Sequence, residues 1–169
     1  MDTNMLLAQY ESARTASLPL LSRITLKRVE HSERMSQETN CYACDVWLDG
    51  KKVADARNDG TGGETIVHWL IPQAVAEFRI ELAAAQGAEP ASVLMFSFTD
   101  AVDYLLHQWV EDRLIKQIIR RYHKKGRHVI LCGDTVFSAP AERMSIVPQV
   151  GDKVQGRVVT AVHLCGGAK

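Results

Sequence analysis

The sequence has no long hydrophobic run, since none of its apolar stretches approaches the ~20 residues of a membrane-spanning helix. It also shows no apolar leader of the kind that directs secretion. We therefore expect a protein of the cytoplasm with no membrane partner. In that reducing compartment the four cysteines are expected to be thiols rather than disulfides.

An excess of either charge is also absent, because 20 Lys and Arg balance 20 Asp and Glu. A protein that binds nucleic acid over its whole surface is usually strongly basic, so the balance argues against that class. With 169 residues, 46% of them hydrophobic and 24% charged, the chain can bury a proper core. We expect a single domain spanning residues 1–169.

The most distinctive stretch predicts a β-hairpin. Side chains from Cys41 to Leu48 alternate with the two-residue period of a strand. Asp49-Gly50 then supplies a two-residue turn whose residues tolerate positive φ. Lys51–Arg57 can return as the antiparallel partner strand.

A second, longer turn is predicted at Asn58, Asp59, Gly60, Thr61, Gly62 and Gly63. Three glycines in six positions indicate positive φ or close approach by another group. The amides could bind an anion, or Asn58 and Asp59 a cation, so Asn58, Asp59, Gly60, Gly62 and Gly63 are candidate binding residues. The alternative is a plain wide turn. An EF-hand register fails, because Arg57 and Ile66 stand where carboxylates are needed.

The run Asp49-Gly50-Lys51-Lys52-Val53 followed by Asn58-Asp59-Gly60-Thr61-Gly62-Gly63 resembles a hairpin of uncharacterised small proteins from bacteriophages and prophages. A weaker echo lies at Val150-Gly151-Asp152-Lys153-Val154-Gln155-Gly156-Arg157-Val158-Val159. The resemblance implies an origin in a mobile element, and it implies no activity and no functional residue. A phage-encoded protein of this kind would act in the host cytoplasm.

The remaining elements follow from periodicity and from helix breakers. Before the hairpin we expect a helical arm at residues 1–18 ended by Pro19, a strand at Ile24–Val29 and a loop at Glu30–Glu38. After it we expect a strand at Glu64–Leu70, a helix from Pro72 to Gly87, and a buried connection or short strand at Ala88–Ser97. A long helix at about residues 99–125, capped by Ser97 or Thr99, is followed by a strand at His128–Leu131, an irregular segment at Thr135–Pro148 and a strand or hairpin at Lys153–Leu164.

This order of elements predicts an α+β fold, in which an antiparallel sheet from the N-terminal half is packed by two helices.

One segment is strongly basic, and it falls at the end of the long helix. Its candidate binding residues are Lys116, Arg120, Arg121, Lys124, Lys125 and Arg127. They could contact phosphates or an acidic partner. Alternatively they compensate the helix dipole in solvent. No nucleic-acid recognition motif accompanies them.

Cys41-Tyr-Ala-Cys44 has the spacing of half a zinc site or of a redox pair. The other half could come only from Cys132, His163 and Cys165. Because Cys41 and Cys44 are three positions apart on a predicted strand, they should face opposite sides of the sheet. We therefore expect structural thiols, with no metal and no cofactor.

Catalytic motifs are missing as well. No Gly-x-Ser-x-Gly occurs, and the Gly-Lys-Ser/Thr of a phosphate-binding loop does not follow the glycines. Asp59, Glu64 and His68 could form an acid/base cluster, and nothing beside them marks a nucleophile. We expect an accessory protein without catalytic activity that binds another protein, such as a host factor or a defence complex. The alternatives are a binder of nucleic acid or a phosphate ligand through the basic helix end, and an enzyme with an unrecognised site.

Overall fold

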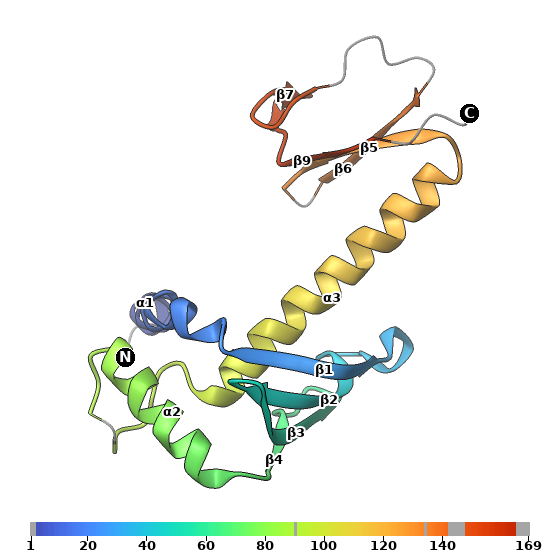
Figure 1. Cartoon of the computed structure of the whole chain (residues 1–169). Coiled ribbons are helices and arrows are strands. Elements are labelled where there is room, and N and C mark those ends of the chain that lie inside the picture. Colours follow the sequence, from blue (N-terminus) through green and yellow to red (C-terminus); the bar gives the residue numbers. More distant parts are fainter. Residues whose placement is uncertain (1–2, 90, 134, 142–147, 165–169) are drawn as a thin grey trace. The chain divides into compact units, whose positions relative to one another are not determined.

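The predicted hairpin is present in the computed structural model, which describes residues 3–89, 91–133, 135–141 and 148–164 (Figure 1). Its strands, Cys41–Leu48 (β2) and Lys51–Asp59 (β3), pair antiparallel across the Asp49-Gly50 turn. The φ angles of the two turn residues are 49° and 78°. Both lie in the left-handed region that a type I′ turn requires, so the turn chemistry expected from the sequence is confirmed.

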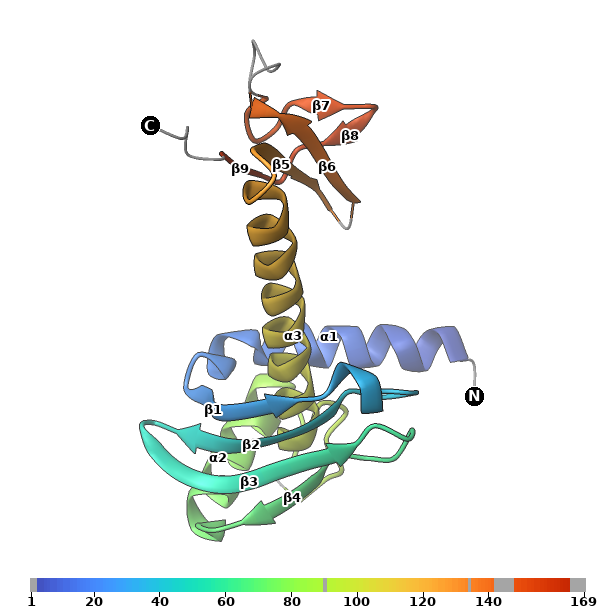
Figure 2. The same cartoon turned by 90° about the vertical axis from the view of Figure 1, so that its right-hand side faces the viewer.

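Four antiparallel strands form one sheet in the order β1-β2-β3-β4 (Figure 2). The outer strands are Ile24–His31 (β1) and Ile66–Trp69 (β4). The predicted loop after β1 contains a short 3-10 helix, Glu33–Met35 (η1). The outer strands were both expected, although β1 extends further and β4 is shorter than the sequence indicated.

Three helices accompany this sheet: Thr3–Leu21 (α1), Pro72–Ala85 (α2) and Phe98–His123 (α3). The prediction that Pro19 ends the first helix is wrong, because α1 continues through Pro19 to Leu21. Proline removes one backbone donor from the helix. Leu21 is only 4% exposed, and burial of its side chain in the core offsets that loss in the last turn.

The start of α3 is capped by a reciprocal pair of hydrogen bonds. The backbone N–H of Ser97 donates to Asp100 Oδ2 (2.7 Å), and the N–H of Asp100 donates to Ser97 Oγ (3.2 Å). This is a capping box with an aspartate in the acceptor position. Of the two predicted caps, Ser97 is therefore the one used. Gly126, with φ of 64°, follows the last turn as expected.

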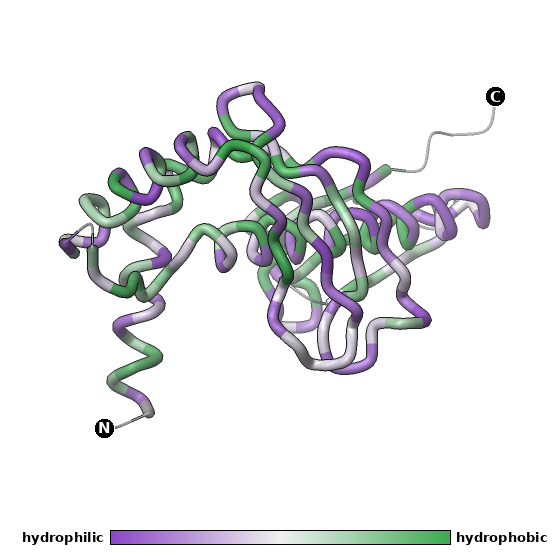
Figure 3. Tube along the Cα trace, turned by 90° about the horizontal axis from the view of Figure 1, so that it is seen from below, coloured by the Kyte–Doolittle hydropathy of each residue, from purple (hydrophilic) through white to green (hydrophobic). Residues whose placement is uncertain are grey.

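One face of the four-stranded sheet is buried beneath the helices (Figure 2). Tyr42, Cys44, Val46 and Leu48 of β2 lie on that face, each no more than 5% exposed. Hydrophobic and hydrophilic residues accordingly alternate along the chain (Figure 3). The other principal core side chains are Phe78, Leu82, Phe96, Phe98, Val102 and Leu106. The α+β class is confirmed.

The connection between α2 and α3 is only partly buried, since Val93 is 93% exposed and Met95 is 40% exposed, and the predicted short strand is not formed among the described residues. Leu94 and Phe96 are buried, yet no strand pairs with this segment in the part of the chain that the structure describes. The side chain of Gln86 takes the place of a partner strand. It accepts the N–H of Phe96 (3.2 Å) and donates to the Phe96 carbonyl (2.7 Å).

The chain divides into two compact units, Met1–Val110 and Glu111–Lys169. The second contains a three-stranded antiparallel sheet in the order β6-β5-β9 and a separate two-stranded hairpin. The elements are Arg127–Cys132 (β5), Thr135–Pro140 (β6), Lys153–Val154 (β7), Arg157–Val158 (β8) and Ala161–His163 (β9). The domain organisation expected from the sequence stays a prediction.

The prediction of an irregular segment at Thr135–Pro148 is wrong for residues 135–140. These residues form β6, which pairs with β5 along the whole length of β6. Pro140 stands at the last position of an edge strand, opposite Arg127. A proline is tolerated there, since a missing N–H on the free side costs no ladder bond. Residues 142–147 lie outside the described residues. The segment Lys153–Leu164, predicted as a strand or a hairpin, forms a hairpin of β7 and β8 that is followed by the strand β9.

Candidate functional site

The Asn58–Gly63 turn is held by its own polar groups. Asn58 Oδ1 accepts hydrogen bonds from the Thr39 hydroxyl (2.8 Å) and from the N–H of Gly60 (2.9 Å). Asn58 Nδ2 donates to the Gly63 carbonyl (2.9 Å). The Asn58 side chain and the Gly60 N–H are thus already paired, whereas the Asp59 carboxylate makes no ion pair among the described residues. This pairing favours a structural turn, and a binding role for its residues stays a prediction.

Gly60 is the point where this turn meets the preceding loop. Its carbonyl accepts the N–H groups of Gln37 (2.9 Å) and Glu38 (3.1 Å). Its φ is 82°, and a Cβ placed there would overlap the Met35 carbonyl oxygen and lie 2.8 Å from Cys41 Cβ. Close backbone approach and positive φ therefore both require glycine here.

A buried hydroxyl cluster lies next to the turn. The Tyr42 hydroxyl donates to Asp103 Oδ1 (2.9 Å), and the Thr65 hydroxyl donates to the same oxygen (2.5 Å). Burial raises the pKa of Tyr42, so the phenol remains a hydrogen-bond donor at neutral pH. The cluster ties the sheet to the second turn of α3. The spacing of these residues in the sequence does not predict the cluster. A tyrosine that alternates onto the buried face of a strand does, however, need a polar partner for its hydroxyl.

The predicted acid/base residues are not brought together. Glu64 lines a cavity of about 320 Å³ beside Asp103. His68 lines a different cavity, on the open face of the sheet beside Arg57. Asp59 lines neither of the two. The arrangement gives no support to a catalytic site built from these three side chains.

The open face of the sheet carries a network of ion pairs around Asp45. Arg28 donates to both carboxylate oxygens of Asp45, at 2.6 and 2.8 Å. Lys52 lies 2.9 Å from Asp45 and 2.6 Å from Asp55. The Arg28 guanidinium, followed by the Lys52 ammonium, holds the pKa of Asp45 well below its usual range.

Replacing Asp45 with asparagine is expected to lower stability at neutral pH and to matter less as the pH falls. A carboxyl whose pKa is lowered by folding stabilises the native state above its ordinary value of 3.8, and that contribution disappears as the pH falls through the lower folded value. Urea midpoints of wild type and Asp45→Asn should therefore converge in acid. Asp59→Asn is the control, because Asp59 makes no ion pair among the described residues. A difference in urea midpoint between wild type and Asp45→Asn that stays constant with pH would contradict a lowered pKa of Asp45 in the folded protein.

The two cysteines of the Cys-x-x-Cys pair have different surroundings. Cys44 is buried in the core with Tyr42 and Val46, whereas Cys41 alternates to the other side of β2 and is half-buried. Burial, followed by the nearby Asp45 charge, raises the pKa of the Cys44 thiol to about 12. Within the described residues, no three potential metal ligands lie together.

Alkylation of the native protein is expected to separate these thiols. A pKa near 12 lowers the thiolate fraction of Cys44 roughly a thousandfold relative to an ordinary thiol, and the thiolate is the reactive form. Iodoacetamide at neutral pH should therefore modify Cys41 long before Cys44, as read by peptide mass spectrometry. Equal rates at the two positions in folded protein would show that Cys44 is not enclosed.

Five exposed cations lie at and just after the end of α3, and we call them the basic band: Lys116, Arg120, Arg121, Lys124 and Lys125. No carboxylate lies within 4.0 Å of any of them in the described chain, so the i, i+4 pair that Asp112 and Lys116 could form is not made. Arg127 differs, since its guanidinium donates to the Ser138 hydroxyl (3.0 Å) and carbonyl (2.7 Å). The sequence-predicted basic residues thus separate into an exposed band and one side chain that joins β5 to β6.

The balanced charge of the whole chain conceals an uneven distribution. Residues 111–169 contain 11 Lys and Arg against 5 Asp and Glu, a formal charge of +6. Residues 1–110 contain 9 against 15, a formal charge of −6. The argument from neutrality against a polyanion-binding surface therefore does not apply to the second unit. Counting charge by half of the chain would have revealed this from the sequence.

Comparisons with protein families, with curated proteins and with solved structures found no match. Among the described residues, none of the helices combines the length and the apolar character needed to cross a bilayer.

Proposed function

We propose that this chain is a binding module that contacts an acidic surface of another protein through the basic band. The observation that carries the proposal is the grouping of five exposed cations, without carboxylate partners among the described residues, within one helix end. Lys116 and Arg120 are a like-charge pair at i, i+4 spacing within α3, and Lys124 and Lys125 place two further cations four residues after Arg120 and Arg121, just past its end. Such pairs destabilise a helix, and a cation or two suffices to compensate its dipole. An external acidic partner gives the surplus charge a role.

Two further observations support a protein as that partner. Leu114, two residues before Lys116, is 39% exposed, and protein interfaces combine apolar contacts with a charged rim. The resemblance of the β2–β3 hairpin and its following turn to phage and prophage proteins favours a host factor or a defence complex. The partner would then lie in the host cytoplasm.

Site-specific photo-crosslinking tests the proposal in a bacterial host lysate. A benzoylphenylalanine at position 116 reports on the band, and the same group at position 153, an exposed lysine of β7, is the matched control. We expect one protein with an acidic surface to be crosslinked in stoichiometric yield from position 116 only. No such product, or the same products from both positions, would remove the band as a contact surface.

A second candidate function is binding of a nucleic-acid backbone, and the +6 charge of residues 111–169 favours it. Phosphate contacts are strongest at low salt, because binding then releases the most counterion free energy. Fluorescence anisotropy of a short generic oligonucleotide at low salt is the direct measurement. An unchanged anisotropy at every protein concentration would end this candidate, and a crosslink that vanishes after nuclease treatment would favour it over a protein partner.

A further inference from the structure

The outer edge of β4 has backbone groups free to pair with another strand. The N–H of Leu70 donates to the Val53 carbonyl (2.8 Å), so this residue pair is a hydrogen-bonded one. In an antiparallel ladder the bonded pairs alternate with unbonded ones, which turns the N–H and C=O of Val67 and Trp69 away from β3. No described residue makes a hydrogen bond to these groups.

The two edges of the sheet are protected differently. On β1 the ladder is broken by a bulge between Lys27 and Glu30, and charged side chains line the strand. Bulges and charges are the usual devices that prevent a sheet edge from pairing with another chain. On β4 the register is regular and no Lys, Arg, Asp or Glu occurs. Ile66 and Trp69 are both more than a third exposed there.

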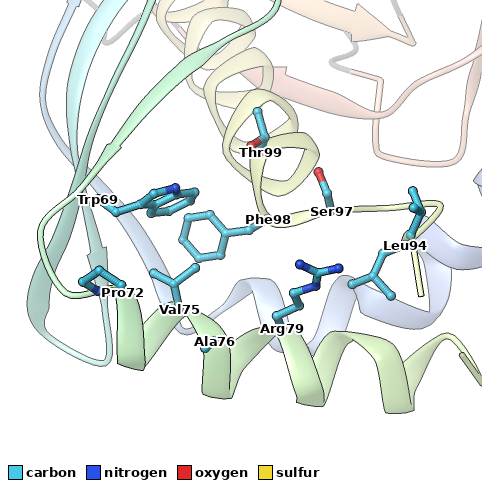
Figure 4. A pocket seen from close by; sticks show the side chains of 10 residues that line it. Trp69, Pro72, Val75, Ala76, Arg79, Leu94, Ser97, Phe98 and Thr99 are labelled. Atoms are coloured by element: carbon cyan, nitrogen blue, oxygen red, sulfur yellow. The ribbon is translucent and has the colours of Figure 1, made fainter. Parts of the chain in front are cut away.

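An apolar pocket lies beside this edge, between the start of α2 and the start of α3 (Figure 4). Its volume is about 460 Å³, within the range of cavities that hold a ligand side chain or small molecule. The ring of Trp69 meets that of Phe98 edge to face at 5.3 Å, and both line the pocket with Val75. A side chain entering between these groups would be largely removed from water.

Arg79 is the charged residue of the pocket lining. Its guanidinium donates to the Ser92 carbonyl (3.0 Å), and no carboxylate lies within 4.0 Å of it among the described residues. The remaining N–H groups of the guanidinium can therefore bind an incoming carboxylate. The pocket thus complements an apolar group that carries a nearby negative charge.

We propose that β4 accepts an extended peptide strand of another protein, with an apolar side chain in this pocket and a carboxylate on Arg79. Strand addition satisfies the outward N–H and C=O groups of Val67 and Trp69. The side chain of Trp69 points to the helix side, so helix-side residues of an added strand fall beside it, over the pocket. This site uses no residue of the basic band and stands independently of it.

The probe is a library of random short peptides with free C-termini, selected on the immobilised full-length chain. The best sequence is then synthesised as a free acid, as a C-terminal amide, and with internal Asp and Glu changed to Asn and Gln. Fluorescence anisotropy of the three forms identifies whether the carboxylate on Arg79 is terminal or from a side chain. Arg79→Gln should weaken binding of the carboxylate-bearing form about tenfold and leave the form without that carboxylate unaffected.

Two variants locate the peptide. Ala76→Trp fills the pocket from an exposed position of α2 and should weaken binding at least about tenfold. Ala84→Trp is its control, since Ala84 is also exposed on α2 and does not line the pocket. Val67→Pro removes an outward N–H without removing a bond to β3, and should weaken binding about fivefold.

Several outcomes would overturn the proposal. One is a selection that enriches no peptide above an unrelated control protein. Another is equal binding by the Ala76→Trp and Ala84→Trp variants, both with native far-ultraviolet circular dichroism. A third is a dimer in sedimentation equilibrium that Val67→Pro dissociates, because a second copy of the chain would then occupy this edge.

Discussion

Replacing Gly60 with alanine is expected to lower the free energy of unfolding of residues 1–110 by about 3 kcal/mol. Part of the loss comes from placing an L-residue at φ of 82°. The rest comes from overlap of the new Cβ with the Met35 carbonyl, which is backbone and cannot move aside without breaking the bonds that Gln37 and Glu38 make to Gly60.

The neighbouring glycines provide graded controls. Gly62 has φ of 90°, but a Cβ there would meet the carboxylate of Glu38, which can swing away, so we expect a loss of about 1 kcal/mol. Gly63 has open space around its Cβ position and should tolerate alanine. All three tryptophans lie in residues 1–110, so urea titrations followed by their fluorescence report on this unit. Equal stability of the Gly60→Ala and Gly63→Ala variants would show that the turn is not anchored at Gly60.

Reversing two charges of the basic band is expected to slow association with an acidic polypeptide about tenfold at low salt. In the double variant Arg121→Glu, Lys125→Glu the charge of residues 111–169 falls from +6 to +2. The defect should shrink as salt is added, because salt screens exposed charges. Stability should change little, since each interaction with the helix end is worth only about 0.3–1 kcal/mol. Stopped-flow rates with poly-glutamate and thermal melting of the same variant measure both effects.

The control for this experiment carries the same charge change elsewhere. Lys153→Glu, Arg157→Glu reverses two exposed cations of the β7–β8 hairpin in the same unit. Near wild-type association for this control would assign the contact to the basic band. Equal slowing by both double variants would instead attribute binding to net charge, and a normal rate for the band variant would leave the helix end a structural feature.

The elements that the sequence predicts well are those fixed by local chemistry. Asp49-Gly50 determines a turn type through two positive φ angles, and the alternation along β2 determines which face is buried. The ends of α3 follow from a capping serine and a terminal glycine. The sequence does not predict β6, because Pro140 is a residue that usually interrupts a strand. Only the pairing with β5 shows that this proline lies on the free edge of the sheet.

The candidate surfaces were less accessible to sequence reasoning, because they depend on which strands become neighbours. Nothing in Ile66–Trp69 indicates that this strand is an edge until the sheet order shows that β4 pairs only with β3. The pocket beside it joins Trp69 to Phe98 and Val75, which come from three separate elements or their boundaries. The bond between Tyr42 and Asp103 likewise spans two elements that no short motif connects.

The opposite charges of the two units also govern how copies of the chain behave in solution. At neutral pH no net charge keeps copies apart, while each half attracts the oppositely charged half of a neighbour. We therefore expect solubility to be lowest near neutrality in dilute buffer and to rise with moderate salt, the reverse of ordinary salting out. At a single pH the same chain can adhere to a cation exchanger through residues 111–169 and to an anion exchanger through residues 1–110.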